Sequence, residues 1–384
     1  MTKFPEASKE ELHLSQLLTN KLKEKIRASN NWLSFSDFMN MALYDPQYGY
    51  YTAPSEVFGP NGDFVTAPNI SNLFAGTFFN HFVSALKKVD NNILEIGSGN
   101  GCFCKDILLN AENEGVDIAN FFILEISKDL IDRQKTMLQK DLSDTAFKKI
   151  VWVKKIPAEF KGIIFTNELF DALPADIYEI RGHEPYKKGV TIINNELEWQ
   201  LDKKPNKELA SKLPLESLPE HYNFEYCEQY DSLLKEFGEA IDKAVVYIVD
   251  YGFTESEYFH IDRSEGTLMC HFKHYAHSNP LVLIGLQDIT SHVNFSHIAR
   301  IATQLNFKIS LYTSQANFLI NAGILNLMEK ISPEDKMNYV KMSSGIQTLV
   351  SPSEMGDLVK VMAITKNIDL DFAEFSRNDR TFNL

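Results

Sequence analysis

The chain has 384 residues, of which 44% are hydrophobic and 23% charged, a balance typical of a globular protein with one or two domains. Its net charge of −14 disfavours a nucleic-acid partner, and no apolar run reaches the roughly 18 residues that a membrane helix needs. The four cysteines show no disulfide or metal-ligand spacing, and the first residues do not resemble a signal or transit peptide. We therefore expect a cytoplasmic protein without a metal, without nucleic acid and without membrane insertion.

The first part of the chain, residues 1–85, is expected to form helices around an irregular segment. An amphipathic pattern ends at Asn30, and residues 34–43 have the pattern of a second helix. Residues 44–68 are rich in Gly, Pro and Tyr, and a loop of this length in a compact domain is usually functional or disordered. Its aromatic content argues against disorder. Residues 70–89 then return to helical spacing of apolar side chains.

Short apolar runs alternate with helical patterns from residue 86 onward. The predicted strands are residues 93–96, 121–124, 150–153, 162–165, 244–249 and 307–312. Continuous apolar strands between helices are typical of a parallel sheet that is buried on both faces. We expect an α/β, Rossmann-like sheet in residues 86–175 and 241–384, and a charged insertion, residues 176–240, that joins residues 1–85 in a smaller accessory lobe.

The first predicted strand ends in a glycine-rich turn, Leu94-Glu-Ile-Gly-Ser-Gly-Asn-Gly101. Glycines there allow a tight turn and a close approach of a ligand to the backbone. The spacing G-x-G-x-G differs from the G-x-G-x-x-G of dinucleotide binders, and Glu95 would repel a pyrophosphate but suit an amino group. These features favour S-adenosylmethionine over a nicotinamide cofactor, although a glycine-rich turn can also serve only to reverse the chain.

The second predicted strand ends in Glu125, whose carboxylate can accept hydrogen bonds from two ribose hydroxyls. Taken alone, an acidic residue at this place is more often a solvated strand end. The glycine turn and Glu125 together favour a nucleoside cofactor. The predicted cofactor-binding residues are Glu95, Gly97, Ser98, Gly99, Gly101, Glu125 and Asn167.

The fourth predicted strand ends in Thr166-Asn-Glu-Leu-Phe-Asp-Ala-Leu-Pro174, at the expected topological switch point between the first and fourth strands. Glu168 and Asp171 are the predicted catalytic residues, and they would share one face if a helical turn followed the strand. Two carboxylates can hold a guanidinium, whose pKa is about 12.5 or above, and take its proton. The alternative is that Asp171 caps a helix and Glu168 faces solvent.

Further polar and aromatic residues are candidates for contact with a substrate, although each one alone is more often structural. The predicted substrate-binding residues are Tyr44, Tyr50, Asp63, Thr66, Asp288 and His292. A long loop together with an inserted lobe suits a large partner better than a buried metabolite. A small-molecule substrate and a homodimer both remain open.

In their order along the chain, these motifs resemble the MidA-like family of class I methyltransferases, from about residue 34 to residue 325. The matching stretches are Phe38-Met39 with Ala42-Leu-Tyr-Asp-Pro46, Gly49-Tyr-Tyr51, Gly62-Asp-Phe-Val-Thr-Ala-Pro68, Glu95 to Gly101, Glu125 with Ser127, Gln134, Asn167 to Pro174, Asp250-Tyr-Gly252, Asp288-Ile-Thr290 with His292-Val293, and Gln315 with Phe318-Leu319. The tyrosine-rich loop and the Asn-Glu-Leu-Phe-Asp-Ala turn are the most specific of these stretches, whereas the glycine turn is generic to the fold.

The resemblance implies a class I methyltransferase fold with S-adenosylmethionine as cofactor and a mainly helical accessory lobe. Mitochondrial members of the family assemble respiratory complex I and methylate an arginine of a core subunit, so the implied activity is protein arginine methylation. The sequence departs from the family at Lys128 and at Asn294. It also departs around residues 197–200, which lie within the inserted lobe expected to select the substrate. The alternative functions are a cofactor-binding assembly factor without turnover and a small-molecule methyltransferase.

Overall fold

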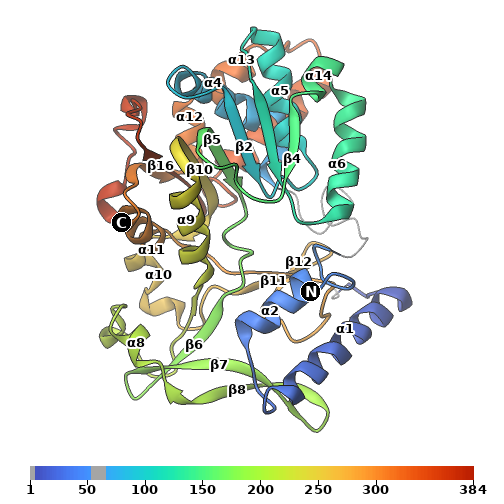
Figure 1. Cartoon of the computed structure of the whole chain (residues 1–384), viewed down its shortest axis with the longest axis vertical. Coiled ribbons are helices and arrows are strands. Elements are labelled where there is room, and N and C mark those ends of the chain that lie inside the picture. Colours follow the sequence, from blue (N-terminus) through green and yellow to red (C-terminus); the bar gives the residue numbers. More distant parts are fainter. Residues whose placement is uncertain (1–4, 53–65) are drawn as a thin grey trace. The chain divides into compact units, whose positions relative to one another are not determined.

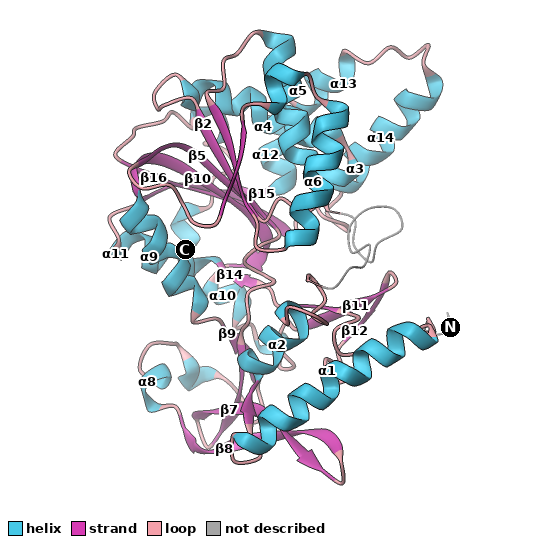
Figure 2. Cartoon of the chain, turned by 45° about the vertical axis from the view of Figure 1, so that its right-hand side comes forward, coloured by secondary structure: helices cyan, strands magenta, loops and turns pink. Residues whose placement is uncertain are grey.

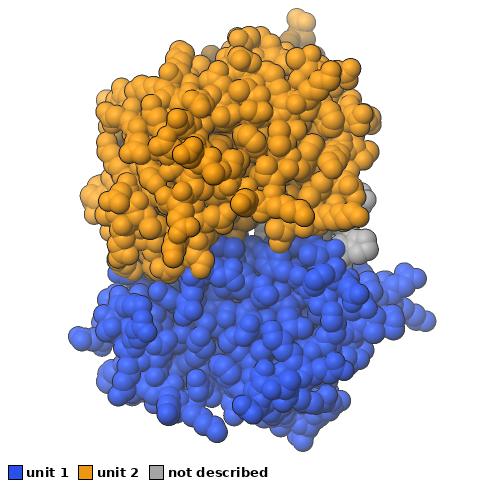
Figure 3. All heavy atoms as spheres, viewed as in Figure 1, with its two compact units in different colours: residues 1–64, 171–230, 255–292 blue, residues 65–170, 231–254, 293–384 orange. Residues whose placement is uncertain are grey.

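The computed structural model describes residues 5–52 and 66–384, and the chain folds into two compact units. Unit 1 comprises residues 1–64, 171–230 and 255–292, and unit 2 comprises residues 65–170, 231–254 and 293–384 (Figure 3). Each unit is therefore assembled from three separate stretches of the chain.

Unit 2 contains an eight-stranded sheet whose order along the main path is β15-β16-β10-β5-β2-β3-β4. Strands β2, β3, β4, β5 and β10 pair in parallel, whereas β16 is antiparallel to both of its neighbours. The short strand β14 pairs with β10. The bounds are β2 (Asn92–Ile96), β3 (Asn120–Leu124), β4 (Ile150–Val153), β5 (Phe160–Asn167), β10 (Ile241–Phe253), β14 (Val293–Asn294), β15 (Lys308–Ser314) and β16 (Val359–Lys366).

Helices cover both faces of this sheet, with α4 and α5 on one face and α9 and α11 on the other (Figure 1 and Figure 2). The bounds are α3 (Ala67–Ile70), α4 (Asn72–Leu86), α5 (Cys102–Glu114), α6 (Lys128–Asp141), α7 (Asp144–Phe147), α9 (Gln229–Ala240), α11 (Phe295–Gln304), α12 (Gln315–Asn321), α13 (Ile324–Glu329) and α14 (Lys336–Val350). The expected Rossmann-like sheet with helices on both faces is confirmed.

Aromatic side chains fill the interface between α4, α5 and the sheet. Phe103 of α5 stacks on Phe165 of β5 with ring centroids 3.9 Å apart, and Phe78 of α4 lies 5.0 Å from Phe165. Burial of each such ring contributes about 1.5–3 kcal/mol. This packing fixes β5 against the start of α5, the helix that follows the glycine turn.

Unit 1 contains a five-stranded sheet, in which β7 pairs with β1, β6 and β8 and β6 pairs with β9, and a three-stranded sheet of order β12-β11-β13. The strands are β1 (Leu33–Ser34), β6 (Asp176–Arg181), β7 (Glu184–Ile193), β8 (Glu196–Pro205), β9 (Asn223–Tyr226), β11 (Met269–Phe272), β12 (Tyr275–His277) and β13 (Asp288–Thr290). The helices are α1 (Lys9–Ala28), α2 (Phe35–Tyr44), α8 (Lys207–Ala210) and α10 (Glu255–Tyr258). Apolar side chains of α1 and α2 pack against β6 and β7 in one core.

The implied description of the accessory lobe as mainly helical is wrong, because the insertion folds as antiparallel strands. Two tight turns join these strands, and both contain consecutive residues with positive φ, Gly182-His183 and Asn194-Asn195. Such pairs favour the two-residue hairpin turns that match the twist of a sheet. The charged residues of the insertion therefore alternate with apolar ones along strands rather than around helices.

Two expected domain boundaries also differ from the structure. Helix α4 lies in unit 2 and not with the N-terminal helices, because its phenylalanines pack against the sheet. Residues 255–292 belong to unit 1, whereas we expected them in the methyltransferase domain. Within residues 5–52 and 66–384, no helix combines the length and apolar character needed to cross a bilayer.

Candidate active site

The carboxyl ends of β2 and β5 are adjacent in unit 2, because β2 pairs with β3 on one side and with β5 on the other. The chain runs outward from β2 to β3 and β4 and then returns to β5 on the opposite side of β2. This arrangement is the predicted switch point, the place at which open α/β sheets bind ligands.

In the glycine turn after β2, the backbone has a left-handed conformation that is energetically unfavourable for any residue with a side chain. Gly97, Gly99 and Gly101 have φ of 73°, 53° and 85°. A Cβ atom on Gly97 would lie 3.1 Å from Leu169 Cδ1. The turn continues directly into α5, and Gly101 N donates to Ser98 O over 2.8 Å. The glycines therefore leave the backbone bare at the switch point.

Glu95 is buried within β2, and its Oε2 accepts a hydrogen bond of 2.7 Å from Ser98 Oγ. Burial raises the pKa of Glu95 to about 8; the Ser98 bond opposes this rise and nearby Glu125 adds to it. The raised pKa means that the hydrogen bond from Ser98 does not fully offset the free-energy cost of burying the ionised carboxylate. A cationic amino group would supply that compensation, in agreement with the predicted role of Glu95.

Glu125 follows β3 and is 8% exposed, so it is not a solvated strand end. Its Oε1 accepts hydrogen bonds from Ile126 N and Ser127 N, at 2.8 and 2.9 Å. Burial raises the pKa of Glu125, and the bonds to Ser127, Ile126 and Gln134 oppose that rise. These contacts hold the carboxylate in one orientation beside the switch point.

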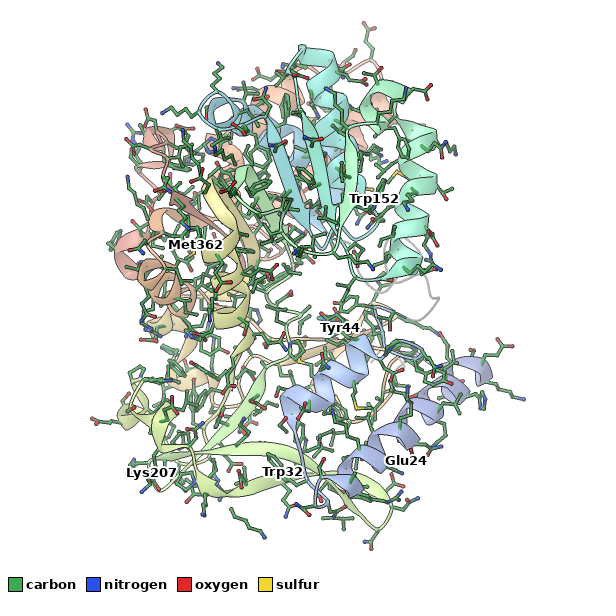
Figure 4. All side chains as sticks on the ribbon, in the orientation of Figure 1. Glu24, Trp32, Tyr44, Trp152, Lys207 and Met362 are labelled. Carbon is green, nitrogen blue, oxygen red and sulfur yellow. The ribbon has the colours of Figure 1, made fainter. Side chains whose placement is uncertain are left out.

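Gln134 of α6 connects the two parts of the predicted cofactor site, a role that the sequence analysis missed. It is fully buried, its Nε2 donates to Gly99 O over 2.8 Å, and it also bonds Glu125. Its Oε1 accepts from Trp152 Nε1 of β4 at 2.9 Å; Figure 4 labels Trp152 beside α6. The only signal in the sequence was the position of Gln134 among the stretches that match the MidA-like family.

Two more observations test whether these residues fit S-adenosylmethionine. Ile126, directly after Glu125, is an apolar side chain that is 69% exposed, which suits contact with the face of an adenine ring. The Oδ1 atom of Asn167 is buried and has no hydrogen-bond partner among the described residues. Buried acceptors are nearly always satisfied in proteins, so this atom is consistent with a ligand donor at the end of β5. The residues present therefore fit the cofactor.

Glu168 immediately follows β5 with φ of 50°, a left-handed conformation that is uncommon for a residue with a side chain. Its Oε1 accepts from Asn167 Nδ2 at 3.2 Å and from Ala67 N of α3 at 3.4 Å. Bends and turns follow it, so the helical turn that would have placed Glu168 and Asp171 on one face is not formed. The main-chain N–H groups of Leu169 and Phe170 bond the side chain of Asp250 instead.

Thr66, a predicted substrate residue, precedes α3 in unit 2. Its Oγ1 accepts a bond of 2.8 Å from Asn69 Nδ2, and Asn69 Oδ1 accepts one of 2.6 Å from Asn100 Nδ2 in the glycine turn. Thr66 therefore lies near the predicted cofactor-binding residues of unit 2. The other predicted member of this stretch, Asp63, lies outside the described residues.

The remaining predicted substrate residues lie in unit 1, where the structure brings most of them together. Tyr51, a residue not among the predicted site residues, donates from its OH to Asp288 Oδ1 over 2.8 Å. Tyr44 stacks on Tyr51 with centroids 5.5 Å apart, and Tyr50 meets it edge-on at 5.1 Å. Burial and then Asp288 hold the pKa of Tyr51 well above its usual range, and Asp171 adds to this effect. We call these five residues the tyrosine–aspartate cluster.

Asp171 and Asp288 of this cluster are 4% and 3% exposed, and no helix begins at Asp171. Tyr44 lies at the end of α2 (Figure 4), and its OH donates to Ala172 O over 3.0 Å. His292, in contrast, is held by Thr267, because its N donates to Thr267 Oγ1 over 3.0 Å. Among the described residues, no group of three or more His, Cys, Asp and Glu side chains is arranged to hold a metal ion.

Residues 75–313 match a family model of S-adenosyl-L-methionine-dependent methyltransferases. A protein from Burkholderia thailandensis, described as a likely methyl transferase and solved with bound S-adenosyl-homocysteine, is 32% identical, with both chains covered completely and a TM-score of 0.94. The mitochondrial protein arginine methyltransferases NDUFAF7 of Danio rerio and Homo sapiens are 25% and 24% identical. These matches cover 86% and 91% of this chain and 83% of each relative. The chain therefore belongs to the MidA-like family of S-adenosyl-L-methionine-dependent methyltransferases, and S-adenosylmethionine is its cofactor.

Proposed function

We propose that this methyltransferase modifies an arginine side chain of a partner protein. The tyrosine–aspartate cluster of unit 1 carries this proposal, because it combines aromatic rings with two buried carboxylates. Carboxylates bind a guanidinium through paired charge-assisted hydrogen bonds, and aromatic faces attract its positive charge. The curated relatives named as protein arginine methyltransferases support the same substrate class.

Each residue of the cluster has a distinct part in this proposal. Tyr51 donates to Asp288 Oδ1, which also accepts from Ile289 N, so the carboxylate is fixed in direction before a substrate arrives. Preorganised groups of this kind reduce the entropy that binding must overcome. Asp171, buried in the same cluster, is the second carboxylate available to a cation.

The cofactor supplies an electrophilic methyl group and keeps the bonding electron pair on its sulfur. A guanidinium nitrogen forms the new N–C bond and must lose one proton as it does so. Glu168, at the end of β5 and next to Asn167, is the carboxylate of unit 2 that we assign to accept this proton. Glu95, Glu125 and Gln134 hold the cofactor, and take no part in the proton transfer.

The test is transfer of labelled methyl groups from S-adenosylmethionine into a cell extract, followed by hydrolysis and identification of the labelled amino acid. We expect label in methylarginine, at a rate about tenfold lower for Asp288→Asn. Asp262→Asn, an exposed aspartate of the same unit, is the matched control and should leave the rate unchanged.

Other outcomes would replace the proposal with a defined alternative. Label in another amino acid would indicate a different protein substrate residue, and label only in small molecules would indicate a metabolite methyltransferase. Cofactor binding without any labelled product would support an assembly factor that has no turnover.

A cytoplasmic location and a homodimer are further parts of the proposal. Cell fractionation tests the location, and light scattering during size-exclusion chromatography tests the oligomeric state. Recovery of the protein with an organelle, as expected for the relatives named mitochondrial, would overturn the cytoplasmic location. A monomeric mass would overturn the homodimer.

A further inference from the structure

Strand β5 is flanked at both ends by a glutamate with left-handed backbone conformation. Glu159 precedes the strand with φ of 52°, and Glu168 follows it with φ of 50°. A left-handed conformation is unfavourable for a residue with a Cβ atom and persists where surrounding contacts impose it. Glu159 is solvent-exposed, whereas Glu168 is the assigned proton acceptor. The contacts that impose the left-handed conformation of Glu168 therefore affect the position of the group that accepts the proton.

Asp250 supplies these contacts from the neighbouring strand β10. Its Oδ2 accepts main-chain hydrogen bonds from Leu169 N at 3.0 Å and from Phe170 N at 2.8 Å. Its Oδ1 accepts from Tyr251 N at 2.9 Å, and the side chain is completely buried. One carboxylate thus binds the two peptide groups that come directly after Glu168.

The backbone of Glu168 itself is held by the same strand. Its N–H donates to Val249 O over 2.9 Å, which continues the pairing of β5 with β10 (Figure 1). Asp250 is the next residue along β10. The chain therefore follows the sheet as far as Glu168 and then turns onto the Asp250 carboxylate. The left-handed φ is the conformation that satisfies both sets of hydrogen bonds.

We propose that Asp250 is a positioning residue that holds Glu168 in its left-handed conformation and so sets the place of its carboxylate. This proposal rests on the assignment of Glu168 as proton acceptor. A displacement of a reacting group by about 1 Å can lower the reaction rate about a hundredfold. A residue that takes no part in the reaction can therefore control its rate by fixing the position of the reacting group.

The first experiment compares cofactor binding with methyl transfer in Asp250→Asn. An amide has the shape of the carboxylate but only one acceptor oxygen, so it cannot accept all three main-chain bonds. We expect the affinity for S-adenosyl-homocysteine to stay within about threefold, and transfer into a cell extract to fall about a hundredfold. Unchanged transfer, or equal losses of binding and transfer, would overturn the positioning role.

The second experiment measures the turn directly and needs no substrate. Hydrogen exchange of the Leu169 and Phe170 amides should become about tenfold faster in Asp250→Asn. The added change Glu168→Gly should restore part of this protection, because glycine adopts positive φ without strain. The added change Glu159→Gly relieves a similar conformation at the other end of β5 and should restore none. Equal exchange with and without Asp250→Asn would show that Asp250 does not hold the turn.

A third variant covers the case in which Asp250→Asn does not fold. Glu168→Gly should have an unfolding midpoint about 2 °C above that of Glu168→Ala, because both variants lose the side-chain bonds to Asn167 and Ala67 and only glycine removes the strain. Equal midpoints for the two variants would show that no strain is held there and would overturn the proposal. If the unaltered enzyme transfers no methyl group to protein, the proposed function fails, but the exchange and unfolding experiments still decide whether Asp250 holds the turn.

Discussion

Two turns leave neighbouring strands at the same edge of the unit 2 sheet, and both contain left-handed backbone. After β2 the residues with positive φ are all glycines, whereas after β5 the residue is Glu168. The first turn leaves bare backbone where we propose that the cofactor binds, and a Cβ atom at Gly97 would meet Leu169 from the second turn. The second turn must present a side chain, so it keeps an unfavourable conformation that Asp250 stabilises. The difference agrees with our proposal that the β2 turn serves binding and the β5 turn serves the reaction.

The largest effect is expected for Glu168→Gln, which removes the proton acceptor and keeps the size of the side chain. Methyl transfer should fall about a thousandfold, the order of magnitude of general-base catalysis. The affinity for S-adenosyl-homocysteine should not change, because the glycine turn and Glu125 are untouched. Transfer at the normal rate, measured with labelled S-adenosylmethionine, would remove the proposed distinction between the two turns. Glu159→Gln at the other end of β5 is the control.

Gly99→Val should have the next largest effect, on binding. A β-branched residue is poorly tolerated at φ of 53°, and its side chain would stand where the cofactor approaches the backbone. We expect calorimetry to show at least about a hundredfold weaker binding of S-adenosyl-homocysteine. Gly115→Val is a matched control, since Gly115 has φ of 65° at the end of α5 and open space around it. Equal loss of affinity in both variants would mean that the effect is general damage to α5.

Gln134→Leu should have a smaller effect, because it removes a support of the β2 turn and not the turn itself. Gly99 O and Trp152 Nε1 lose their partner, and Glu125 loses one of its donors. The unmet bonds cost about 1–3 kcal/mol, so affinity for S-adenosyl-homocysteine should fall about tenfold. Gln139→Leu, an exposed position on α6, should leave the affinity unchanged. No difference between the two variants would exclude Gln134 from the cofactor site.

The smallest effect concerns Glu95 and pH. Its folded-state pKa of about 8 lies above the ordinary value of 4.5, so its contribution to stability is fully present below pH 4.5 and is lost as pH rises to about 8. The unfolding midpoint of the cofactor-free protein should therefore decline across this window, and Glu95→Gln should make the decline shallower. An identical pH profile for both proteins would show that Glu95 is already ionised at low pH.

Local patterns in the sequence were sufficient for six of the eight strands of the unit 2 sheet, all except β14 and β16, and for several helix starts. The side chain of Ser127, for example, accepts from Leu130 N and caps the start of α6. Capping and apolar periodicity involve residues within one or two turns of each other, so they are readable without the fold. The charged insertion was harder, because its alternation is interrupted by the hairpin turns at residues 182–183 and 194–195.

The supporting residues of the site could not be predicted, because their partners are distant in the chain. Asp250 binds the amide of Leu169, which lies 81 positions before it, and Gln134 binds Gly99 O, which lies 35 positions before it. The conformation of Glu168 depends on the pairing of β5 with β10, and no local rule favours glutamate with positive φ. The sequence therefore identified the groups at the two turns, and the fold shows what holds them.

The most direct test of the proposed distinction is calorimetric titration of three proteins with S-adenosyl-homocysteine: the unaltered chain, Gly99→Val and Glu168→Gln. We predict micromolar binding by the unaltered chain, equal binding by Glu168→Gln and no measurable binding by Gly99→Val. Normal binding by Gly99→Val, or lost binding by Glu168→Gln, would contradict the assignment of binding to the β2 turn and of the reaction to the β5 turn.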